Sequence, residues 1–323
     1  MKTTSLAVWL TLLLTALPGC ALAQQLVVPP THPVTVRAYV HDPDGRPVEG
    51  ATVTLSFTYY RGKESTGQSV RQETAKDGFA MVSGTAEAEY RIRTEKSGYY
   101  RTIGPVRYLD TEVGLKKYAT GTQAVDIELR PIRDQVVGIH KGIEKLRIPA
   151  LDKPFGFDLE VGDWVTPDGR GKIADLIFKL DGYFNSPDDY SFKLNAILPG
   201  SGDGLQAVQV EPLPERGSAF QLPYEAPLTG YHSSHIWERS HIGKERTSSG
   251  EWKGGTVFLF RIRTVLDSNG NVVRALYGYM DGNVDYRGTP EQGVKLSFTY
   301  WLNPEWTRSL EADPKKTVTV VQP

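Results

Sequence analysis

Apolar and polar residues alternate along most of this chain, and this period of two is the feature that most restricts its fold. The pattern runs over residues 34–40, 90–95, 157–161 and 190–198. Successive side chains of a strand point to opposite faces of a sheet, so alternation indicates strands with one buried face. No segment shows the 3.6-residue period of a helix longer than two turns. The sequence therefore predicts an all-β protein.

Length and turn residues predict the division into domains. The 323 residues correspond to about two domains at roughly 150 residues each. Strand patterns occupy residues 33–131 and 156–312, and the segment between them carries two glycines and two prolines. We predict two antiparallel β-sandwich domains in tandem, joined by a linker over 132–155 and followed by a tail over 313–323.

One hairpin is predicted sharply. Residues 256–265 and 272–279 are apolar-rich and flank the turn Asp267-Ser268-Asn269-Gly270. Asn-Gly suits the two positive φ angles of a type I′ turn, so it is a strong short-range hairpin signal.

The N-terminus has the form of a secretory signal peptide over residues 1–23. Lys2 precedes an apolar stretch over 6–17, and Ala21-Leu22-Ala23 is a small-residue cleavage site. The stretch is shorter than the roughly 20 residues that span a bilayer, so we expect no transmembrane helix. A second interpretation stays open, because Leu17-Pro18-Gly19-Cys20 has the form of a bacterial lipobox that would place a lipid anchor on Cys20. Both predict export from a bacterial cell to a periplasmic, outer-membrane-associated or extracellular location.

Charge and cysteine content exclude several classes of protein. Lysine and arginine number 37 against 38 acidic residues, for a net charge of -1, which argues against a nucleic-acid partner. The single cysteine excludes an intrachain disulfide framework and any site built from several thiolates.

Residues 33–131 resemble a known family of small domains. The residues that carry the resemblance are Asp44-Gly45, Pro47-Val48-Glu49-Gly50-Ala51-Thr52-Val53, Thr74 to Phe79, Tyr90 and Gly98-Tyr99. This set is similar to the carboxypeptidase regulatory-like domain, a transthyretin-like β-sandwich common in exported bacterial proteins. The resemblance implies a non-catalytic module that serves as a spacer or interaction platform. The second half resembles no named family.

Three histidines form the candidate metal site. His232, His235 and His241 fall within ten residues, and three imidazoles leave an open position on a zinc ion. Their spacing fits neither a helical pair nor a strand pair, so an exposed polar loop is the competing interpretation.

A group of carboxylates comes next, namely Asp175, Asp181, Asp188 and Asp189. Two facing carboxylates could cleave a glycosidic bond, and aspartate oxygens could hold calcium. Ordinary turn chemistry explains the same residues. Zinc and calcium are thus the cofactors considered, and the sequence requires neither.

An aromatic segment is the preferred binding site. Residues 223–255 show weak strand alternation and predict a long loop, which in a compact domain is usually functional or disordered. Trp237, Trp252 and Tyr231 would stack on a ligand there, with Arg239 supplying hydrogen bonds.

These features favour an exported, non-enzymatic cell-envelope protein with a β-sandwich platform and a domain that binds a glycan or protein partner. Two alternatives remain, a secreted glycan- or ester-cleaving hydrolase with its site in the second half, and a structural envelope or assembly component.

Overall fold

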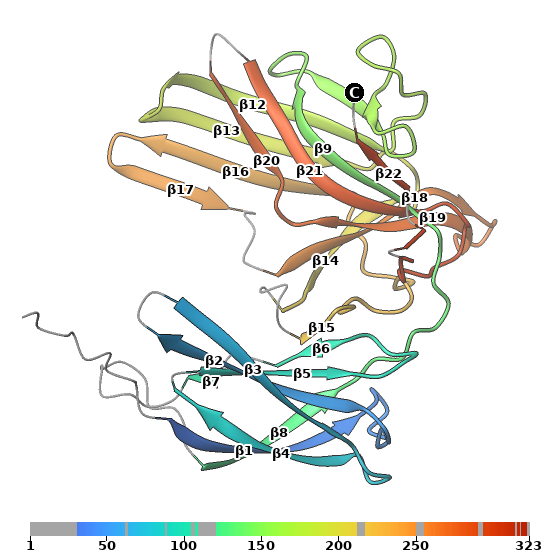
Figure 1. Ribbon diagram of the computed structural model, residues 1–323. Coiled ribbons are helices and arrows are strands. Elements are labelled where there is room, and N and C mark those ends of the chain that lie inside the picture. The colour runs from blue at the N-terminus through green and yellow to red at the C-terminus, as the bar shows by residue number, and fades with distance from the viewer. Residues whose placement is uncertain are drawn as a thin grey trace, which may run out of the picture.

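The described part of the chain is built from strands. The computed structural model describes residues 31–61, 64–87, 89–104, 107–108, 121–211, 217–249, 255–289, 293–313, 315–316 and 318–321. Every regular element among them is a β-strand, and they form two sandwiches placed one above the other (Figure 1). The expected signal peptide and Cys20 lie outside these residues. No helix able to cross a membrane occurs within them.

The first sandwich packs a small sheet on a larger one. The small sheet has the order β4 (Phe79–Ala86), β1 (His32–His41), β8 (Gly121–Glu128), with β8 parallel to β1. The larger has the order β15 (Gly217–Ser218), β6 (Thr102–Ile103), β5 (Glu89–Glu95), β2 (Thr52–Arg61), β3 (Glu64–Glu73), and β7 (Arg107–Tyr108) also pairs with β5.

Alternation builds the core of this sandwich as predicted. Val34, Val36, Ala38 and Val40 are all at most 1% exposed and pack with the inward residues of β2 and β5. The turn before β4 depends on Gly78, whose φ is 78° and whose position leaves a Cβ only 2.5 Å from the Val40 carbonyl oxygen. A side chain is therefore excluded there twice, by backbone conformation and by space.

The second sandwich is larger. One sheet has the order β11 (Asp163–Trp164), β10 (Pro154–Asp158), β12 (Leu176–Ser186), β13 (Asp189–Ile197), β16 (Ser234–Ile242), β17 (Glu245–Ser249). The other has the order β14 (Gly204–Gln209), β18 (Thr256–Leu266), β19 (Val272–Asp281), β21 (Gly293–Asn303), β9 (Ile139–Arg147), β22 (Val318–Val321), with β20 (Asp285–Thr289) paired to β21. The hairpin expected around Asn269-Gly270 is confirmed as β18 and β19, but Gly270 has a positive φ and Asn269 does not, so the turn is not of type I′.

Rings from both sheets fill the space between them. Phe157, Trp164 and Phe178 meet edge to face with centroids 5.6–6.2 Å apart, and Phe298 joins them from β21. The chain is thus two β-sandwich domains in tandem, as the alternation predicts. The pairs β1–β8 and β9–β22 are parallel, so the sheets are antiparallel in the main rather than throughout.

The structure corrects the expected linker and tail. Residues 139–147 of the expected linker form β9, which pairs with β21 inside the second sandwich. The charged residues of this strand break the apolar and polar alternation by which strands were predicted. One of them, Lys141, is buried and donates a hydrogen bond from its ammonium group to the Val161 carbonyl. Residues 318–321 of the expected tail form β22 beside β9.

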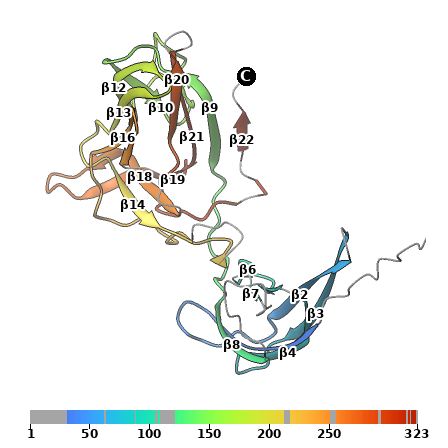
Figure 2. The ribbon, with the colours of Figure 1, turned by 90° about the vertical axis from the view of Figure 1, so that its left-hand side faces the viewer.

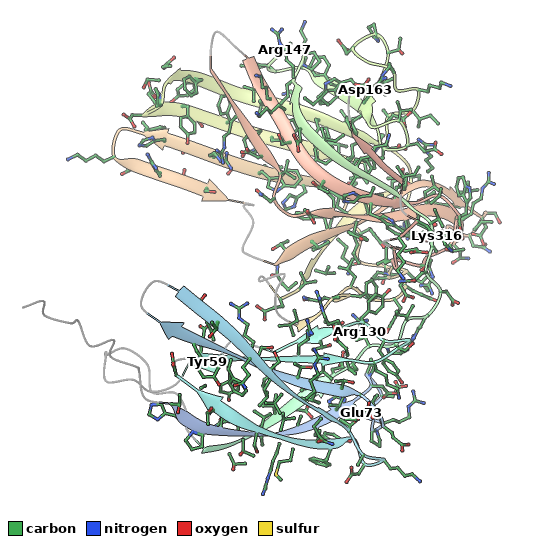
Figure 3. All side chains as sticks on the ribbon, in the orientation of Figure 1. Tyr59, Glu73, Arg130, Arg147, Asp163 and Lys316 are labelled. Carbon is green, nitrogen blue, oxygen red and sulfur yellow. The ribbon has the colours of Figure 1, made fainter. Side chains whose placement is uncertain are left out.

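The two domains share a bonded junction. β15 comes from the second half of the chain and pairs with β6 of the first sandwich. Arg130 lies where the two sandwiches meet (Figure 3) and donates to the carbonyls of Phe220 and Leu222 at 3.0 and 2.8 Å. Its guanidinium also lies over the Tyr224 ring, 4.6 Å from the centroid. Figure 2 shows that the two sandwiches meet in a narrow region at β6 and β15.

Candidate functional site

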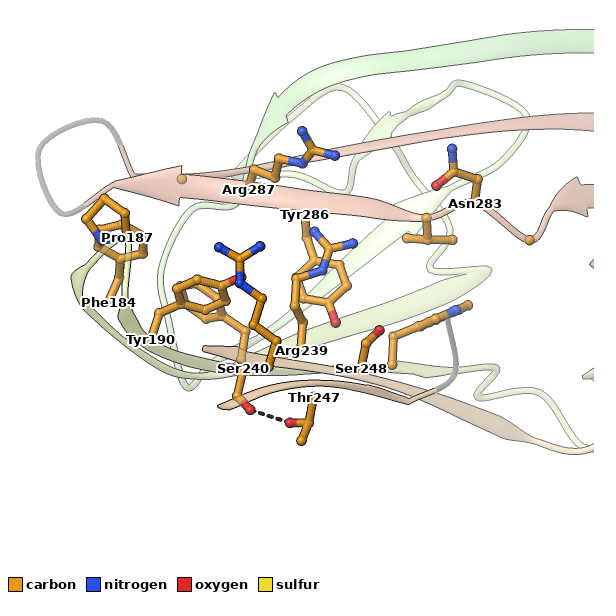
Figure 4. Close-up of a pocket in the computed structure, with 16 residues that line it drawn as sticks. Phe184, Pro187, Tyr190, Arg239, Ser240, Thr247, Ser248, Asn283, Tyr286 and Arg287 are labelled. Carbon is orange, nitrogen blue, oxygen red and sulfur yellow. Dashed lines mark hydrogen bonds between the residues drawn. The ribbon is translucent and has the colours of Figure 1, made fainter. Parts of the chain in front are cut away.

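A cavity of about 750 Å³ opens at one end of the second sandwich, where the two sheets diverge. The strands β12, β13, β16 and β17 form one side and β20 the other (Figure 4). Its volume lies within the range of about 300–1,000 Å³ typical of small-molecule sites. The lining residues are Phe184, Pro187, Tyr190, Phe192, Trp237, Arg239, Ser240, Arg246, Thr247, Ser248, Gly282, Asn283, Val284, Tyr286, Arg287 and Gly288.

One wall of the cavity is a stack of three rings. Phe184 and Tyr190 lie nearly parallel, with an angle of 10° and centroids 5.8 Å apart. Phe192 stacks on both at 6.0–6.5 Å. Tyr190 and Phe192 are two residues apart on β13 and so share its inward face, and Phe184 is the register partner of Tyr190 on β12. Tyr190 is only half-buried, so the stack presents aromatic surface to the cavity.

Three arginines also line the cavity, two from the sheet that carries the rings and one from the facing strand β20. Arg239 on β16 lies over the Tyr286 ring, 5.0 Å from its centroid, and donates to Asp285 at 3.2 Å. Arg287 on β20 donates to the same carboxylate oxygen at 2.8 Å. Arg246 on β17 is exposed and makes no ion pair with another described residue. The cavity therefore combines a flat aromatic wall with a cationic rim.

Trp237 forms part of the floor, and its expected exposure is wrong. It is 1% exposed, because the segment predicted as a loop is the hairpin β16–β17, on which Trp237 points between the sheets. Its ring meets His235 and Phe258 edge to face, at 4.5 and 5.6 Å. Its indole N–H has no hydrogen-bond partner among the described residues. Trp237 is thus a core ring that reaches the cavity rather than a surface contact.

The other predicted ligand contacts are dispersed. Arg239 lies at the cavity with Trp237, as the preferred grouping requires. Tyr231 lies elsewhere, on the outer face of the β18–β19 sheet, where Arg261 stacks over its ring at 4.6 Å. Burial raises the pKa of the Tyr231 phenol. Trp252 lies outside the described residues.

The three histidines do not come together as zinc ligands. His232 is exposed and forms a bridge with Leu205, while His235 packs against Trp237 and Phe258 inside the sandwich. Burial lowers the pKa of the His235 imidazole, which favours its neutral form. His241 is buried and donates from Nδ1 to the Pro187 carbonyl at 2.7 Å. No group of three metal-ligating side chains occurs within the described ranges. The odd spacing reflects strand positions rather than a metal site.

The predicted carboxylate group is also scattered. Asp181 pairs with Lys179 at 2.6 Å, and Asp188 lies 3.3 Å from the His241 ring. Asp189 accepts hydrogen bonds from Tyr183 and Asn185 at the tip of the β12–β13 hairpin. Turn chemistry accounts for Asp188 and Asp189, whereas Asp181 lies within β12, where the sequence had indicated a turn.

Asp175 belongs to a buried ionic cluster around Arg263. The guanidinium of Arg263 donates to both oxygens of Asp175, at 2.8 and 2.9 Å, and to Asp158 at 3.1 Å. It also bonds the partly exposed Glu160. Burial raises the pKa of the Asp175 carboxyl, although Arg263 opposes that rise. The φ of 53° at Arg263 belongs to a bulge between β18 and β19, which turns the side chain toward these acids. The cluster ties the two sheets together.

Sequence reasoning missed most of the cavity lining. Tyr190 and Phe192 belong to a strand whose alternation predicted core positions rather than a site, and the strand that carries Tyr286 was not predicted. Arg246 and Arg287 lie in polar stretches that look like ordinary surface. Only the pairing of strands brings the rings and the arginines to one opening.

Comparisons with known proteins add little. No family model matches the chain, and no curated protein matches it. Among solved structures, a candidate carbohydrate-binding protein from Bacteroides uniformis ATCC 8492 matches at 11% identity over 82% of this chain and 95% of that chain, with a TM-score of 0.19. The shaft pilin SpaA of Lactobacillus rhamnosus GG matches at 12% identity over 88% and 95% of the two chains, with a TM-score of 0.21. At these TM-scores neither protein transfers a function to this chain.

Proposed function

We propose that this chain is an exported, non-enzymatic protein of the bacterial cell envelope whose second domain binds a glycan. The binding site is the cavity between β13, β16 and β20. The single observation that carries the proposal is the stack of Phe184, Tyr190 and Phe192 facing a rim of hydrogen-bonding side chains across an open space.

The chemistry of the lining suits sugars. A pyranose has apolar C–H faces and a belt of hydroxyl groups, so it needs flat rings for its faces and fixed donors and acceptors for its edges. The rings are held by sheet packing and lose little freedom on binding. Ser248, Asn283 and Arg239 supply polar groups at the opening (Figure 4).

The same lining supports binding over cleavage. Hydrolysis of a glycosidic bond ordinarily uses two carboxyl groups on either side of the bond. The residues described around the cavity supply rings, hydroxyls, an amide and guanidiniums, with Asp285 held behind two arginines. These groups bind and orient a ligand.

The first domain serves as a platform in this proposal. Its strand motifs resemble the carboxypeptidase regulatory-like domain, and a spacer at the N-terminal side would hold the binding domain away from a membrane if Cys20 is lipidated. The junction through β15 and Arg130 fixes the binding domain on this platform.

A binding array tests the proposal. The purified mature protein is applied to an array of neutral and acidic oligosaccharides, together with a Tyr190→Ala variant. Truncation of Tyr190 removes a half-buried ring of the stack, so we expect binding to fall at least tenfold while the domain stays folded, which its melting transition shows. The control is Tyr183→Ala, because Tyr183 lies on the same hairpin but is 40% exposed on the opposite face. Absence of binding to every sugar, or an equal loss in both variants, would refute a glycan site in this cavity.

A further inference from the structure

We infer that the glycan bound in this cavity is acidic, and that Arg239, Arg246 and Arg287 hold a carboxylate of a uronic-acid sugar. This inference rests on the proposed function and narrows it to one class of ligand.

The first support is the local charge. Three arginines line the cavity, and among the described residues Asp285 is the carboxylate that pairs with them. Arg239 and Arg287 share one oxygen of Asp285, and Arg246 forms no ion pair with any described residue. The cavity thus carries an excess of positive charge in a protein whose net charge is -1. An excess of cations on one rim attracts an anion and is unfavourable when no anion is bound.

Two other acids of the described part of the chain, Glu238 and Asp188, do not cancel this excess. Glu238 lies on the outer face of β16 and pairs there with Lys193 at 3.2 Å. Asp188 is 77% exposed and lies beside His241, behind the Pro187 turn. Neither residue lines the cavity.

The second support is the arrangement of the arginines on both sides of the opening. Arg239 and Arg246 come from the β16–β17 hairpin, and Arg287 comes from β20 in the facing sheet (Figure 4). A guanidinium is planar, keeps its charge at all relevant pH values and matches a carboxylate with two parallel hydrogen bonds. Arg239 lies between the sheets, whereas Arg287 is directed away from the rings and is 78% exposed, so it would reach a carboxylate at the outer rim of the opening (Figure 4).

The third support links the charge to a sugar ring rather than to a free anion. The arginines and the stack of Phe184, Tyr190 and Phe192 line the same cavity, so a ligand that fills it needs a flat apolar face as well as a negative charge. A uronic acid carries both, because its carboxylate projects from the edge of the pyranose. The floor adds the buried indole N–H of Trp237, a donor that no described residue satisfies. A ligand oxygen that accepted this hydrogen bond would satisfy a buried donor.

The experiment compares acids with their own esters. Titration calorimetry is run with oligosaccharides of galacturonic, glucuronic and mannuronic acid, each as the free acid and as the methyl ester. The ester keeps the ring and removes the charge. We expect at least one acid to bind at least tenfold more tightly than its ester, and this preference to weaken with added salt.

Substitutions of the arginines test whether they recognise the carboxylate. Arg246→Gln and Arg287→Gln should each reduce affinity for the acid about tenfold or more and leave affinity for the ester unchanged. Arg71→Gln is the matched control, since Arg71 is an exposed arginine on the edge strand β3 of the other domain, and it should change neither.

The outcomes separate this inference from the proposed function. Equal binding of acids and esters, or of neutral sugars alone, overturns the acidic ligand and leaves the glycan site standing. Binding of inorganic sulfate as tight as that of the acidic sugars overturns recognition of the ring. Binding of none of these sugars, on the array or in the calorimeter, overturns both.

Discussion

Replacement of Arg263 by methionine should destabilise the second domain strongly. Arg263 is 16% exposed and is the cation that neutralises Asp158 and Asp175, whose side chains are 3% and 1% exposed. Methionine keeps most of the stem but removes every charged hydrogen bond. Removal of one partner of a buried ion pair costs about 3–5 kcal/mol, because the remaining charge is left without compensation.

The two acids should respond differently. Asp158 keeps four backbone N–H donors, from Glu160, Val161, Lys172 and Ile173, so it stays ionised. Asp175 keeps only the N–H of Leu159, and burial already raises its pKa. Without Arg263 the Asp175 carboxyl should take up a proton in the folded state. A carboxyl whose folded pKa lies above its unfolded value adds stability below the unfolded value, and that stability is lost as pH rises through the folded value. The deficit of the variant should therefore shrink as pH falls.

Calorimetric melting at pH 8 and pH 5 measures this effect. For a domain of this size about 1 kcal/mol corresponds to about 2–4 °C, so the transition of the second domain should fall by about 6–20 °C at pH 8 and by less at pH 5. Adding Asp175→Asn to the variant should restore part of the loss at pH 8. The control is Arg37→Met, an exposed position that should change stability by no more than about 0.5 kcal/mol. A fall below 2 °C, or the same deficit at both pH values, would refute the reasoning.

Two further predictions concern the first domain and the junction. Gly78→Ala should lower the free energy of unfolding by more than the roughly 1–2 kcal/mol of a left-handed residue, because its Cβ also meets the Val40 carbonyl. Gly45→Ala, at the same φ of 78° but in open space, should lower it only by the conformational part. Chemical denaturation of both variants measures the difference, and equal losses would contradict the prediction. Arg130→Gln removes the ring contacts and two carbonyl bonds that join the domains. The melting transitions of the two domains should then move apart, as calorimetry can show, and an unchanged profile would show that the junction does not couple them.

Alternation predicted the strands well where a strand has one apolar face. It succeeded for β1, which buries one side in a core. The β18–β19 hairpin was predicted from two apolar runs around Asn269-Gly270, and its strands bury both faces, with Phe260 in one core and Leu259 in another. Alternation failed for β9, where Lys141 is buried and Lys145 forms a bulge with φ 53°. A bulge shifts the period by one residue, so the inward and outward sets no longer follow a single pattern.

The site was predictable only in part for a related reason. On β16 the inward residues His235, Trp237 and Arg239 include two polar side chains, which gave the strand the pattern of a loop. Inward polar residues are expected where a sandwich opens into a cavity, but the sequence does not show where the sheets diverge. The sequence therefore identified Trp237 and Arg239 as site residues, but only the strand pairing showed that Trp237 is a core ring and that Arg239 lines the cavity.

The strand β22 has a consequence for how the protein avoids pairing with itself. A sheet edge with free N–H and C=O groups is a template for edge-to-edge aggregation. β22 covers β9 from Ile139 to Gly142, and beyond that point the bulge at Lys145 and the charge of Arg147 make the edge irregular. A chain shortened before Val318 would bare the regular half of this edge. We expect such a chain to associate through β9, so the residues of β22 protect this edge of the seven-stranded sheet from pairing with another chain.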